Sequence, residues 1–221
     1  MLERVLEPEV MDSPEEAEGY DAMDHREPNE AFVNRLLELG ARGRMLDLGT
    51  GPGDIPLLLA GRMAEAEITG VDLARSMLAL AERKRAAHPA GGRVRFQVAD
   101  AKELPFEDGA FDTVFSNTIL HHIPDPRPFL REAWRVLKPG GVLLIRDLMR
   151  PSDRATLDRL VALHASDCDP LQRDLFRASL HAAFRPGEVE ALAAECGLAG
   201  VEVVVDSDRH LSLQGRRPGA A

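Results

Sequence analysis

The chain has 221 residues, of which 44% are hydrophobic, and a formal net charge of −10 at pH 7. This length is within the range of one α/β domain, so we expect a single domain over residues 1–221. Residues 1–30 carry eleven acidic residues and two arginines, and the rest of the chain is almost neutral. A nucleic-acid enzyme needs a basic surface to contact phosphates, and the sequence has no basic cluster. Nucleic acid is therefore not an expected partner.

The apolar residues do not form a run of about 18, so a membrane is not an expected partner either. The first twenty residues are acidic where a secretory signal has a basic head and an apolar centre. The two cysteines, Cys168 and Cys196, have no CxxC spacing, which argues against a metal knuckle or a disulfide framework. We expect a cytoplasmic protein without a bound metal, as a monomer or a homodimer.

Strand-like and helix-like segments alternate along the chain, which predicts a sheet with helices on both faces. A helix is expected over residues 29–39, where apolar residues share one face and Gly40 ends the pattern. The sequence Lys138-Pro139-Gly140-Gly141 is a stop and turn signal. The expected strands are 44–49, 67–73, 93–100, 111–117 and 141–148, and the expected helices between them are 54–63, 75–87 and 126–137.

The C-terminal third departs from this alternation. Residues 152–184 have the pattern of one or two helices, and we interpret them as an insertion that covers the substrate, because ligands bind beyond the carboxyl ends of such strands. A further helix is expected from Arg185 to about Cys196, followed by a hairpin of residues 201–206 and 210–215. The acidic residues 1–30 are either a solvated segment or a lid that closes on the substrate.

The strongest local signal is the sequence Asp47-Leu48-Gly49-Thr50-Gly51-Pro52-Gly53-Asp54, in which a strand runs into a glycine-rich turn and a helix. Glycines let the backbone approach a ligand without a Cβ clash. Dinucleotide-binding proteins use such a turn with a third glycine, and Asp54 stands at that position. An acidic side chain there opposes a pyrophosphate and favours a zwitterionic methionine tail, whose ammonium would lie near Asp47.

Polar side chains also end the next three expected strands. Asp72 can accept hydrogen bonds from both hydroxyls of a ribose, a feature that NAD enzymes share. Asp100, followed by Ala101, can accept a hydrogen bond from an adenine amino group, and Asn117 ends the fourth strand. Because these strand ends meet along one crevice, the set suits an amino acid, a ribose and an adenine in series.

With these motifs, the chain resembles the class I S-adenosylmethionine-dependent methyltransferases, in the small-molecule group similar to the ubiquinone/menaquinone-type enzymes. The matching stretches are MLDLGTGPG, ITGVDLARSMLALA, VADAKELPFEDGAFDTVFSNTILHHIPDP and LREAWRVLKPGGVLLIRDLMRP, which together span about residues 44–151. The resemblance implies a three-layer αβα Rossmann-like sheet of seven strands, in the order 3-2-1-4-5-7-6 with the last strand antiparallel. Residues 1–30 and 152–184 lie outside the shared motifs.

The resemblance also implies S-adenosyl-L-methionine as the cofactor and S-adenosyl-L-homocysteine as the product. It assigns Gly49, Thr50 and Gly51 to the methionine portion, Asp72 to the ribose, Leu73 and Met77 to the faces of the adenine, Asp100 and the Ala101 backbone to its edge, and Asn117 to the sulfonium end. Asp47, before the glycines, completes the expected cofactor set. The acceptor is expected to be a small molecule.

Methyl transfer from a sulfonium is an in-line displacement that requires neither a metal nor a covalent intermediate. Alignment contributes roughly 7–11 kcal/mol, whereas a general base adds about 10²–10⁴-fold. A base is therefore needed only when the acceptor must lose a proton. The candidate catalytic residues are His121 and His122, which follow the fourth strand, and Tyr20, the single tyrosine. Further candidates for a base or an acceptor contact are Asp147, His164, Cys168, Arg177 and His181.

Other functions remain open at this point. An NAD-dependent oxidoreductase could use the same sheet, and a non-catalytic protein could bind S-adenosylmethionine only for structure. The charge balance disfavours a macromolecular acceptor. Within a small-molecule methyltransferase, the acceptor atom could be oxygen, nitrogen, sulfur or carbon. The motifs are closest to quinone carbon methylation, but the insertion has few aromatic residues for a long isoprenoid tail, and two cysteines are too few for arsenic methylation.

Overall fold

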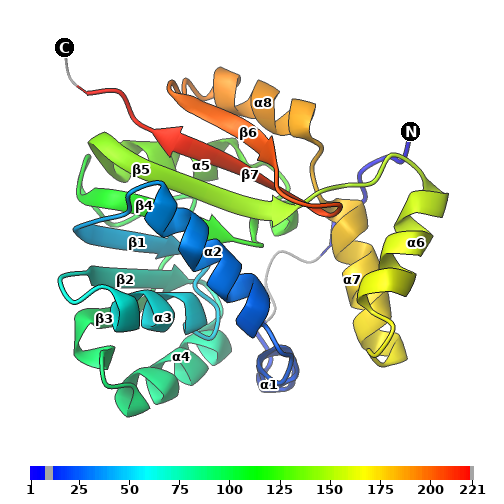
Figure 1. The fold of residues 1–221 in the computed structure, drawn as a ribbon, viewed down its shortest axis with the longest axis horizontal. Helices are drawn as coiled ribbons and strands as arrows, with labels where there is room; N and C mark the ends of the chain where they lie inside the picture. Colours follow the sequence, from blue (N-terminus) through cyan, green and yellow to red (C-terminus); the bar gives the residue numbers. More distant parts are fainter. Residues whose placement is uncertain (8–11, 220–221) are drawn as a thin grey trace.

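The structure, a computed structural model, describes residues 1–7 and 12–219. Its sheet has seven strands in the order β3-β2-β1-β4-β5-β7-β6 (Figure 1). β7 runs antiparallel to both β5 and β6, and the other neighbouring strands are parallel. This confirms the predicted order and the antiparallel last strand. The strands are β1 (Arg44–Leu48), β2 (Glu67–Asp72), β3 (Val94–Val98), β4 (Phe111–Asn117), β5 (Leu137–Leu148), β6 (Val201–Val205) and β7 (His210–Arg216).

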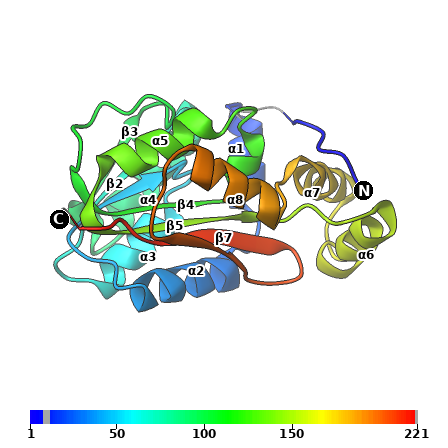
Figure 2. The same cartoon turned by 90° about the horizontal axis from the view of Figure 1, so that it is seen from above.

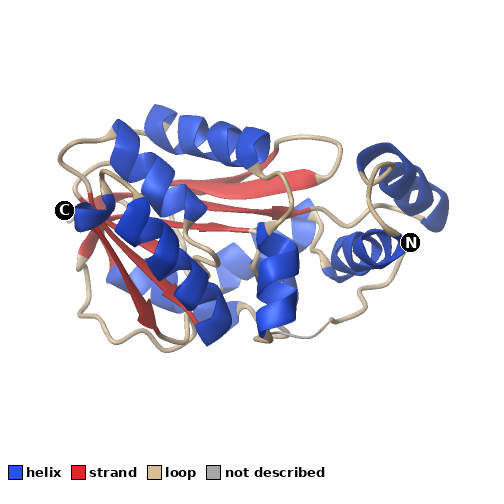
Figure 3. Ribbon diagram, turned by 90° about the horizontal axis from the view of Figure 1, so that it is seen from below, coloured by secondary structure: helices blue, strands red, loops and turns tan. Residues whose placement is uncertain are grey.

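Helices lie on both sides of this sheet (Figure 3). They are α1 (Pro14–Asp21), α2 (Arg26–Glu38), α3 (Asp54–Arg62), α4 (Arg75–Ala87), α5 (Arg127–Val136), α6 (Arg154–His164), α7 (Pro170–Ala182) and α8 (Pro186–Glu195), with single turns η1 (Gly91–Arg93) and η2 (Leu120–His122). The expected helices are all present, with bounds within three residues of the prediction. Among the described residues, no helix combines the length and the apolar character that crossing a membrane requires.

Alternation of side chains along the strands divides the core into two layers. Leu46 and Leu48 of β1 pack in one cluster with buried residues of α5 and α8, whereas Met45 packs in another with residues of α2 and α3. β5 alternates in the same way, with Leu143 in the first cluster and Leu144 in the second. Strands buried on both faces therefore place α5 and α8 on one side and α2 and α3 on the other (Figure 2).

The turn sequence before β5 differs from the prediction. β5 begins at Leu137 and includes the Lys138–Gly141 segment that we expected to separate a helix from a strand. β4 pairs with β5 at Phe111 and Leu137, and next at Thr113 and Val142, so the extra residues of β5 bulge out of the ladder. The left-handed backbone of Gly140 (φ +77°) allows this bulge. The Lys138–Gly141 turn is therefore a bulge within β5 and not a loop before it.

The expected helical insertion forms two helices, α6 and α7, which lie beyond the carboxyl end of β5 (Figure 1). Residues 1–7, which we call the N-terminal strap, run alongside them. The Leu2 N–H donates to the Ser152 carbonyl (2.9 Å) and the Val5 N–H to the His181 carbonyl (3.3 Å). Acidic residues 1–30 are thus not simply a solvated segment, although residues 8–11 lie outside the described part of the chain.

Candidate functional site

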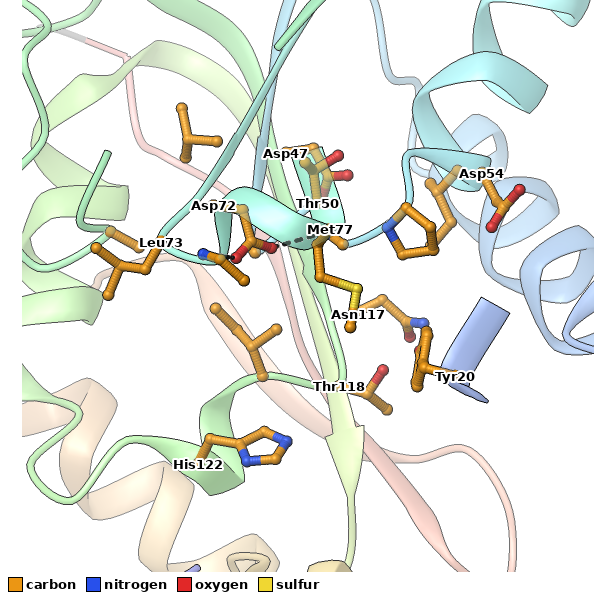
Figure 4. Close-up of a pocket in the computed structure, with 18 of the residues that line it drawn as sticks. Tyr20, Asp47, Thr50, Asp54, Asp72, Leu73, Met77, Asn117, Thr118 and His122 are labelled. Carbon is orange, nitrogen blue, oxygen red and sulfur yellow. Dashed lines mark hydrogen bonds between the residues drawn. The ribbon is translucent and has the colours of Figure 1, made fainter. Parts of the chain in front are cut away.

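A pocket opens at the carboxyl ends of β1, β2 and β4 (Figure 4). Every residue of the predicted cofactor set lines it, as do two of the three candidate catalytic residues, Tyr20 and His122. The predicted cofactor set is Asp47, Gly49, Thr50, Gly51, Asp72, Leu73, Met77, Asp100, Ala101 and Asn117. The sequence interpretation missed other lining residues, among them His25, Asn29, Lys102, Thr118, Ile119 and Ile123.

The glycine-rich turn shapes the floor of this pocket. Gly49 and Gly51 have φ angles of +71° and +52°, a left-handed conformation that favours glycine. A Cβ on Gly49 would lie 2.4 Å from a methyl of Ile119, whereas a Cβ on Gly51 would meet nothing within 4 Å. Because Gly51 lines the pocket, the space beside it is available to a ligand. Gly49 is therefore needed for close packing against Ile119, whereas Gly51 leaves space for a ligand beside the backbone.

Asp47 is the next-to-last residue of β1, and its carboxylate is buried, with only 2% of the residue exposed. Burial, together with the nearby charge of Asp72, raises the pKa of Asp47 to about 7. Among the described residues, no basic side chain forms an ion pair with it. A carboxylate buried without a counter-charge at the edge of a pocket fits a ligand that brings a positive group, such as the ammonium of an amino acid.

Asp72, at the end of β2, is held by the backbone around it. Its two oxygens accept hydrogen bonds from the Gly51 N–H (2.8 Å) and the Ala74 N–H (2.9 Å), and Figure 4 shows its carboxylate in the pocket. Burial raises the pKa of Asp72, and the backbone hydrogen bonds oppose that rise. Since a carboxylate has about four acceptor sites, two bonds leave others for ligand hydroxyls. The arrangement is fixed before any ligand binds.

Asp100 lies just after the end of β3, as predicted, but its carboxylate is already paired with Lys102. Its Oδ1 accepts the Lys102 N–H (2.8 Å) and is 3.1 Å from Lys102 Nζ. Lys102 also lines the pocket. Any adenine amino group that contacts Asp100 therefore approaches a carboxylate already paired with a lysine, and this contact would be weaker than those at Asp47 and Asp72.

The Asp54 charge is compensated in the structure. Lys84 of α4 contacts the Asp54 carboxylate at 2.7 and 2.8 Å and also pairs with Asp21 of α1. Asp54 therefore opposes a pyrophosphate less strongly than an isolated carboxylate at the helix start would. The same lysine joins α1, and with it Tyr20, to α3 and α4 above the glycine-rich turn.

Tyr20 enters the pocket from α1, beside Thr118 (Figure 4). Burial and the Asp54 charge raise the pKa of the Tyr20 phenol, so it stays protonated near neutral pH and acts as a hydrogen-bond donor. Its ring stacks on His25 with centroids 4.6 Å apart. Thr118 has a φ of +59°, the single left-handed non-glycine residue among those described. Such strain concentrates at functional sites, but it is not visible in a sequence.

His121 does not line the pocket. It is 3% exposed, with Nδ1 2.5 Å from Asp147 Oδ1 and Nε2 3.2 Å from Glu7 Oε1. Burial acts to lower the pKa of His121, but the two carboxylates outweigh it and raise the pKa to about 9. A protonated, enclosed imidazole cannot take a proton from an acceptor. Asp147 is likewise 2% exposed and engaged with His121, so neither residue is available as a base.

His122 follows His121 in η2 and does border the pocket (Figure 4). Its Nδ1 lies 3.3 Å from Glu7 Oε1 of the N-terminal strap. The strap itself is fastened by Arg4, whose guanidinium donates to the carbonyls of His121 (2.9 Å), Ile123 (3.0 Å) and Ala182 (2.6 Å). Sequence analysis did not single out Arg4 or Glu7, because no local pattern links the strap to η2.

None of the four candidates in the helical insertion lines the pocket. His164 is paired with Asp208 (2.8 Å), and Arg177 is paired with Asp158. Cys168 packs against the α6–α7 cluster, and the His181 carbonyl accepts the Val5 N–H of the strap. His164 therefore joins α6 to the turn between β6 and β7, and the other three residues lie where α6, α7 and the strap meet.

Comparisons with known proteins agree with this arrangement. Residues 46–145 match the family model described as a methyltransferase domain. The chain is 41% identical over 140 residues to a demethylmenaquinone methyltransferase of Thermus thermophilus, covering 56% of this chain and 63% of that protein. It is 35% identical over 123 residues to a 27-O-demethylrifamycin SV methyltransferase of Amycolatopsis mediterranei, covering 56% and 45%. The chain spans about half to three fifths of the length of the first curated relatives it matches.

The comparison with solved structures covers more of the chain than the sequence matches do. The crystal structure of an S-adenosylmethionine-dependent methyltransferase from Aquifex aeolicus has a TM-score of 0.69 at 20% identity, covering 93% of this chain and 98% of that one. The shared fold therefore includes the segments outside the matched motifs. Residues 46–145 thus match a methyltransferase domain, and over this segment the chain is similar to the ubiquinone/menaquinone methyltransferases. Its sheet order and glycine-rich turn are those that the resemblance to class I S-adenosylmethionine-dependent methyltransferases led us to expect.

Proposed function

We propose that this protein transfers the methyl group of S-adenosyl-L-methionine to a small-molecule acceptor and releases S-adenosyl-L-homocysteine. The observation that carries the proposal is the pair of carboxylates, the buried Asp47 and the half-buried Asp72, in one pocket with a glycine-rich turn. A ligand with an ammonium group and two neighbouring hydroxyls satisfies both. A pyrophosphate brings negative charge toward these two carboxylates, which disfavours the NAD-dependent oxidoreductase.

The ionised Asp47 binds the ammonium in this proposal, and the free acceptor sites of Asp72 bind the ribose hydroxyls. Gly51 lets the methionine portion lie close to the backbone, where a side chain would intrude. The remaining lining residues of the predicted set take the positions that the resemblance implies: Gly49 and Thr50 at the methionine portion, Leu73 and Met77 at the adenine faces, Asp100 and Ala101 at its edge, and Asn117 at the sulfonium end.

When bound, the cofactor supplies a methyl group already activated by its positive sulfur. The protein's residues then have to align an acceptor with it, an effect worth roughly 7–11 kcal/mol. In this proposal, the Tyr20 phenol, which lines the pocket, donates a hydrogen bond to the bound acceptor. Where the acceptor must lose a proton, His122 takes it, because it borders the pocket and His121 is enclosed between carboxylates.

The acceptor class is a carbon or an oxygen nucleophile on a cyclic small molecule. One relative is named as a C-methyltransferase of ubiquinone/menaquinone biosynthesis and another as a 27-O-demethylrifamycin SV methyltransferase, so the two names state a carbon acceptor and an oxygen acceptor. The α1 helix acts as a lid in this proposal, since it holds Tyr20 against the pocket and is joined to α3 and α4 through Lys84. Direct acceptor contact by α6 and α7, a cytoplasmic location and a monomeric or homodimeric state stay predictions.

The proposal is tested by incubating the full chain with S-adenosyl-L-methionine and a panel of quinols, phenols, amines and thiols. Release of S-adenosyl-L-homocysteine that depends on one acceptor class supports it. Tyr20→Phe and His122→Asn should lower that turnover and leave cofactor binding intact, while His164→Asn, outside the pocket, should change neither. Cofactor binding without turnover across the whole panel would support the non-catalytic alternative instead.

A further inference from the structure

Three metal-ligating side chains converge where the N-terminal strap meets η2. Glu7, His121 and His122 each place a ligand atom within 4.8 Å of the other two. Glu7 Oε1 lies 3.2 Å from Nε2 of His121 and 3.3 Å from Nδ1 of His122. Nitrogen and oxygen ligands at about 2.0–2.2 Å from a tetrahedral zinc ion are themselves roughly 3.3 Å apart. Both distances match the edge of such a tetrahedron.

Oε1 of Glu7 faces two imidazole nitrogens without a well-directed hydrogen bond to either, although the protonated His121 offsets its charge. The Glu7 side chain is 9% exposed, and both nitrogens lie within 3.3 Å of this buried oxygen. A buried carboxylate oxygen without a hydrogen bond is costly. An ion placed between the three ligand atoms would satisfy it, because each atom would direct a lone pair at the ion.

Asp147 supplies the outer partner that metal-bound histidines have. Its Oδ1 lies 2.5 Å from His121 Nδ1, and the same carboxylate accepts the backbone N–H groups of His121 (3.2 Å) and Leu148 (2.6 Å). A carboxylate on the far nitrogen of a histidine fixes its ring and directs Nε2 at the metal. The charges also balance, since the carboxylates of Glu7 and Asp147 offset a divalent cation.

We propose that Glu7, His121 and His122 bind one divalent transition-metal ion, zinc by the nature of the ligands, which ties the N-terminal strap to η2 beside the pocket. Two imidazoles and one carboxylate leave a fourth position for water. Binding displaces the proton that His121 holds in the metal-free protein. With the ion on Nδ1, His122 keeps a proton on Nε2 and donates a hydrogen bond, so the role of base given to His122 under the proposed function belongs to the metal-free protein. The proposal does not rest on methyl transfer, because none of the three ligands belongs to the cofactor set.

The lack of CxxC spacing, from which we expected no metal, does not bear on this site. Its ligands are histidines and a glutamate, and Glu7 comes from the other end of the chain. The pairing becomes visible only after the strap is placed against α7 and η2.

The test uses the full chain, freed of metal with a chelator and titrated with Co²⁺ and with Zn²⁺. We expect one equivalent per chain, with the visible absorption of tetrahedral Co²⁺. Glu7→Gln and His122→Ala should weaken Co²⁺ binding by about 10–100-fold or more, because loss of an outer partner alone has an effect of that size. His164→Ala is the matched control, since His164 is also paired with a carboxylate but lies outside the cluster. It should bind as the wild type does.

A wild-type chain that takes up neither ion overturns the proposal, and so do folded Glu7→Gln and His122→Ala variants with unchanged affinity. His121 is then only a protonated imidazole held between the carboxylates of Glu7 and Asp147. Circular dichroism checks the folding of each variant, and the wild-type stoichiometry decides the matter if a variant does not fold. S-adenosyl-L-homocysteine binding, measured in parallel, separates failure of the metal site from failure of the proposed function.

Discussion

The cofactor side of the pocket and the buried cluster beside it, at η2, are built in different ways. On the cofactor side, one continuous stretch from β1 to the loop after β3 supplies the glycines and three carboxylates, and the sheet topology brings them together. On the η2 side, a cluster of Glu7, His121, His122 and Asp147 joins three segments that are far apart in the sequence. The first side depends on backbone conformation at strand ends. The second depends on buried charges that balance one another.

The largest effect should come from breaking that charge balance. His121→Gln leaves the Asp147 and Glu7 carboxylates without a counter-charge in a buried place, which costs about 3–5 kcal/mol of unfolding free energy. Urea unfolding in the presence of a chelator measures this. His164→Gln, whose partner Asp208 is 40% exposed, should cost at most about 1 kcal/mol. Equal losses in both variants would contradict the contrast between the two sides.

Two alanine substitutions test whether the cofactor side depends on backbone conformation. Gly49→Ala should lose about 1–2 kcal/mol through its left-handed backbone, and about 1–3 kcal/mol more through the clash with Ile119. Gly51→Ala bears only the first cost, yet its methyl group enters the pocket. We expect Gly51→Ala to fold and to lose cofactor affinity. Thermal unfolding and calorimetric titration separate the two effects, and a Gly51→Ala variant that binds as well as the wild type would contradict the assignment.

The Asp47 pKa of about 7 predicts a pH dependence. Because the ionised form binds the ammonium, affinity for S-adenosyl-L-homocysteine should rise as the pH increases from 6 to 8, by up to about tenfold per unit below the pKa. Stability of the unliganded protein changes in the opposite direction. The folded state holds the Asp47 proton more tightly than the unfolded chain does, so this stabilisation is lost as the pH rises through 7. Asp47→Asn should flatten both trends, and a wild-type affinity independent of pH over this range would contradict the role given to Asp47.

The smallest effect is expected at Lys84, which pairs with Asp21 and Asp54 at the border of α1, α3 and α4. The three side chains are a quarter to two fifths exposed, so Lys84→Met should cost no more than about 1 kcal/mol of stability. Urea unfolding at low and high salt measures it, since the wild type should lose the difference as the salt increases. A loss of several kcal/mol would show that the lid contributes to stability as the core does.

The contrast also explains what the sequence could predict. The succession of β1 to β5 follows from local patterns, and strand, glycine-turn and helix signals place Asp47 and Asp72 near strand ends. The order of the strands in the sheet, and the inclusion of Leu73 and Met77 in the cofactor set, follow from the resemblance to class I methyltransferases.

The bulge of β5 at Gly140 could not be predicted, because it depends on pairing with β4. Nor could the enclosure of His121, which requires Glu7 of the strap and Asp147 of β5 to meet. Charge pairs between distant segments have no local signature in a sequence. For the same reason, His164 and Arg177 of the helical insertion were candidates for acceptor contact, whereas in the structure they form ion pairs outside the pocket.

The central claim is that the pocket binds S-adenosylmethionine through its two strand-end carboxylates. Calorimetric titration of the wild type and Asp72→Ala with S-adenosyl-L-methionine, S-adenosyl-L-homocysteine and NADH tests it most directly. We expect micromolar binding of the first two ligands, no binding of NADH, and a loss of about 1.5–3 kcal/mol of binding free energy in Asp72→Ala. A wild-type chain that binds neither sulfur compound, or that prefers NADH, would contradict the account and indicate a dinucleotide site.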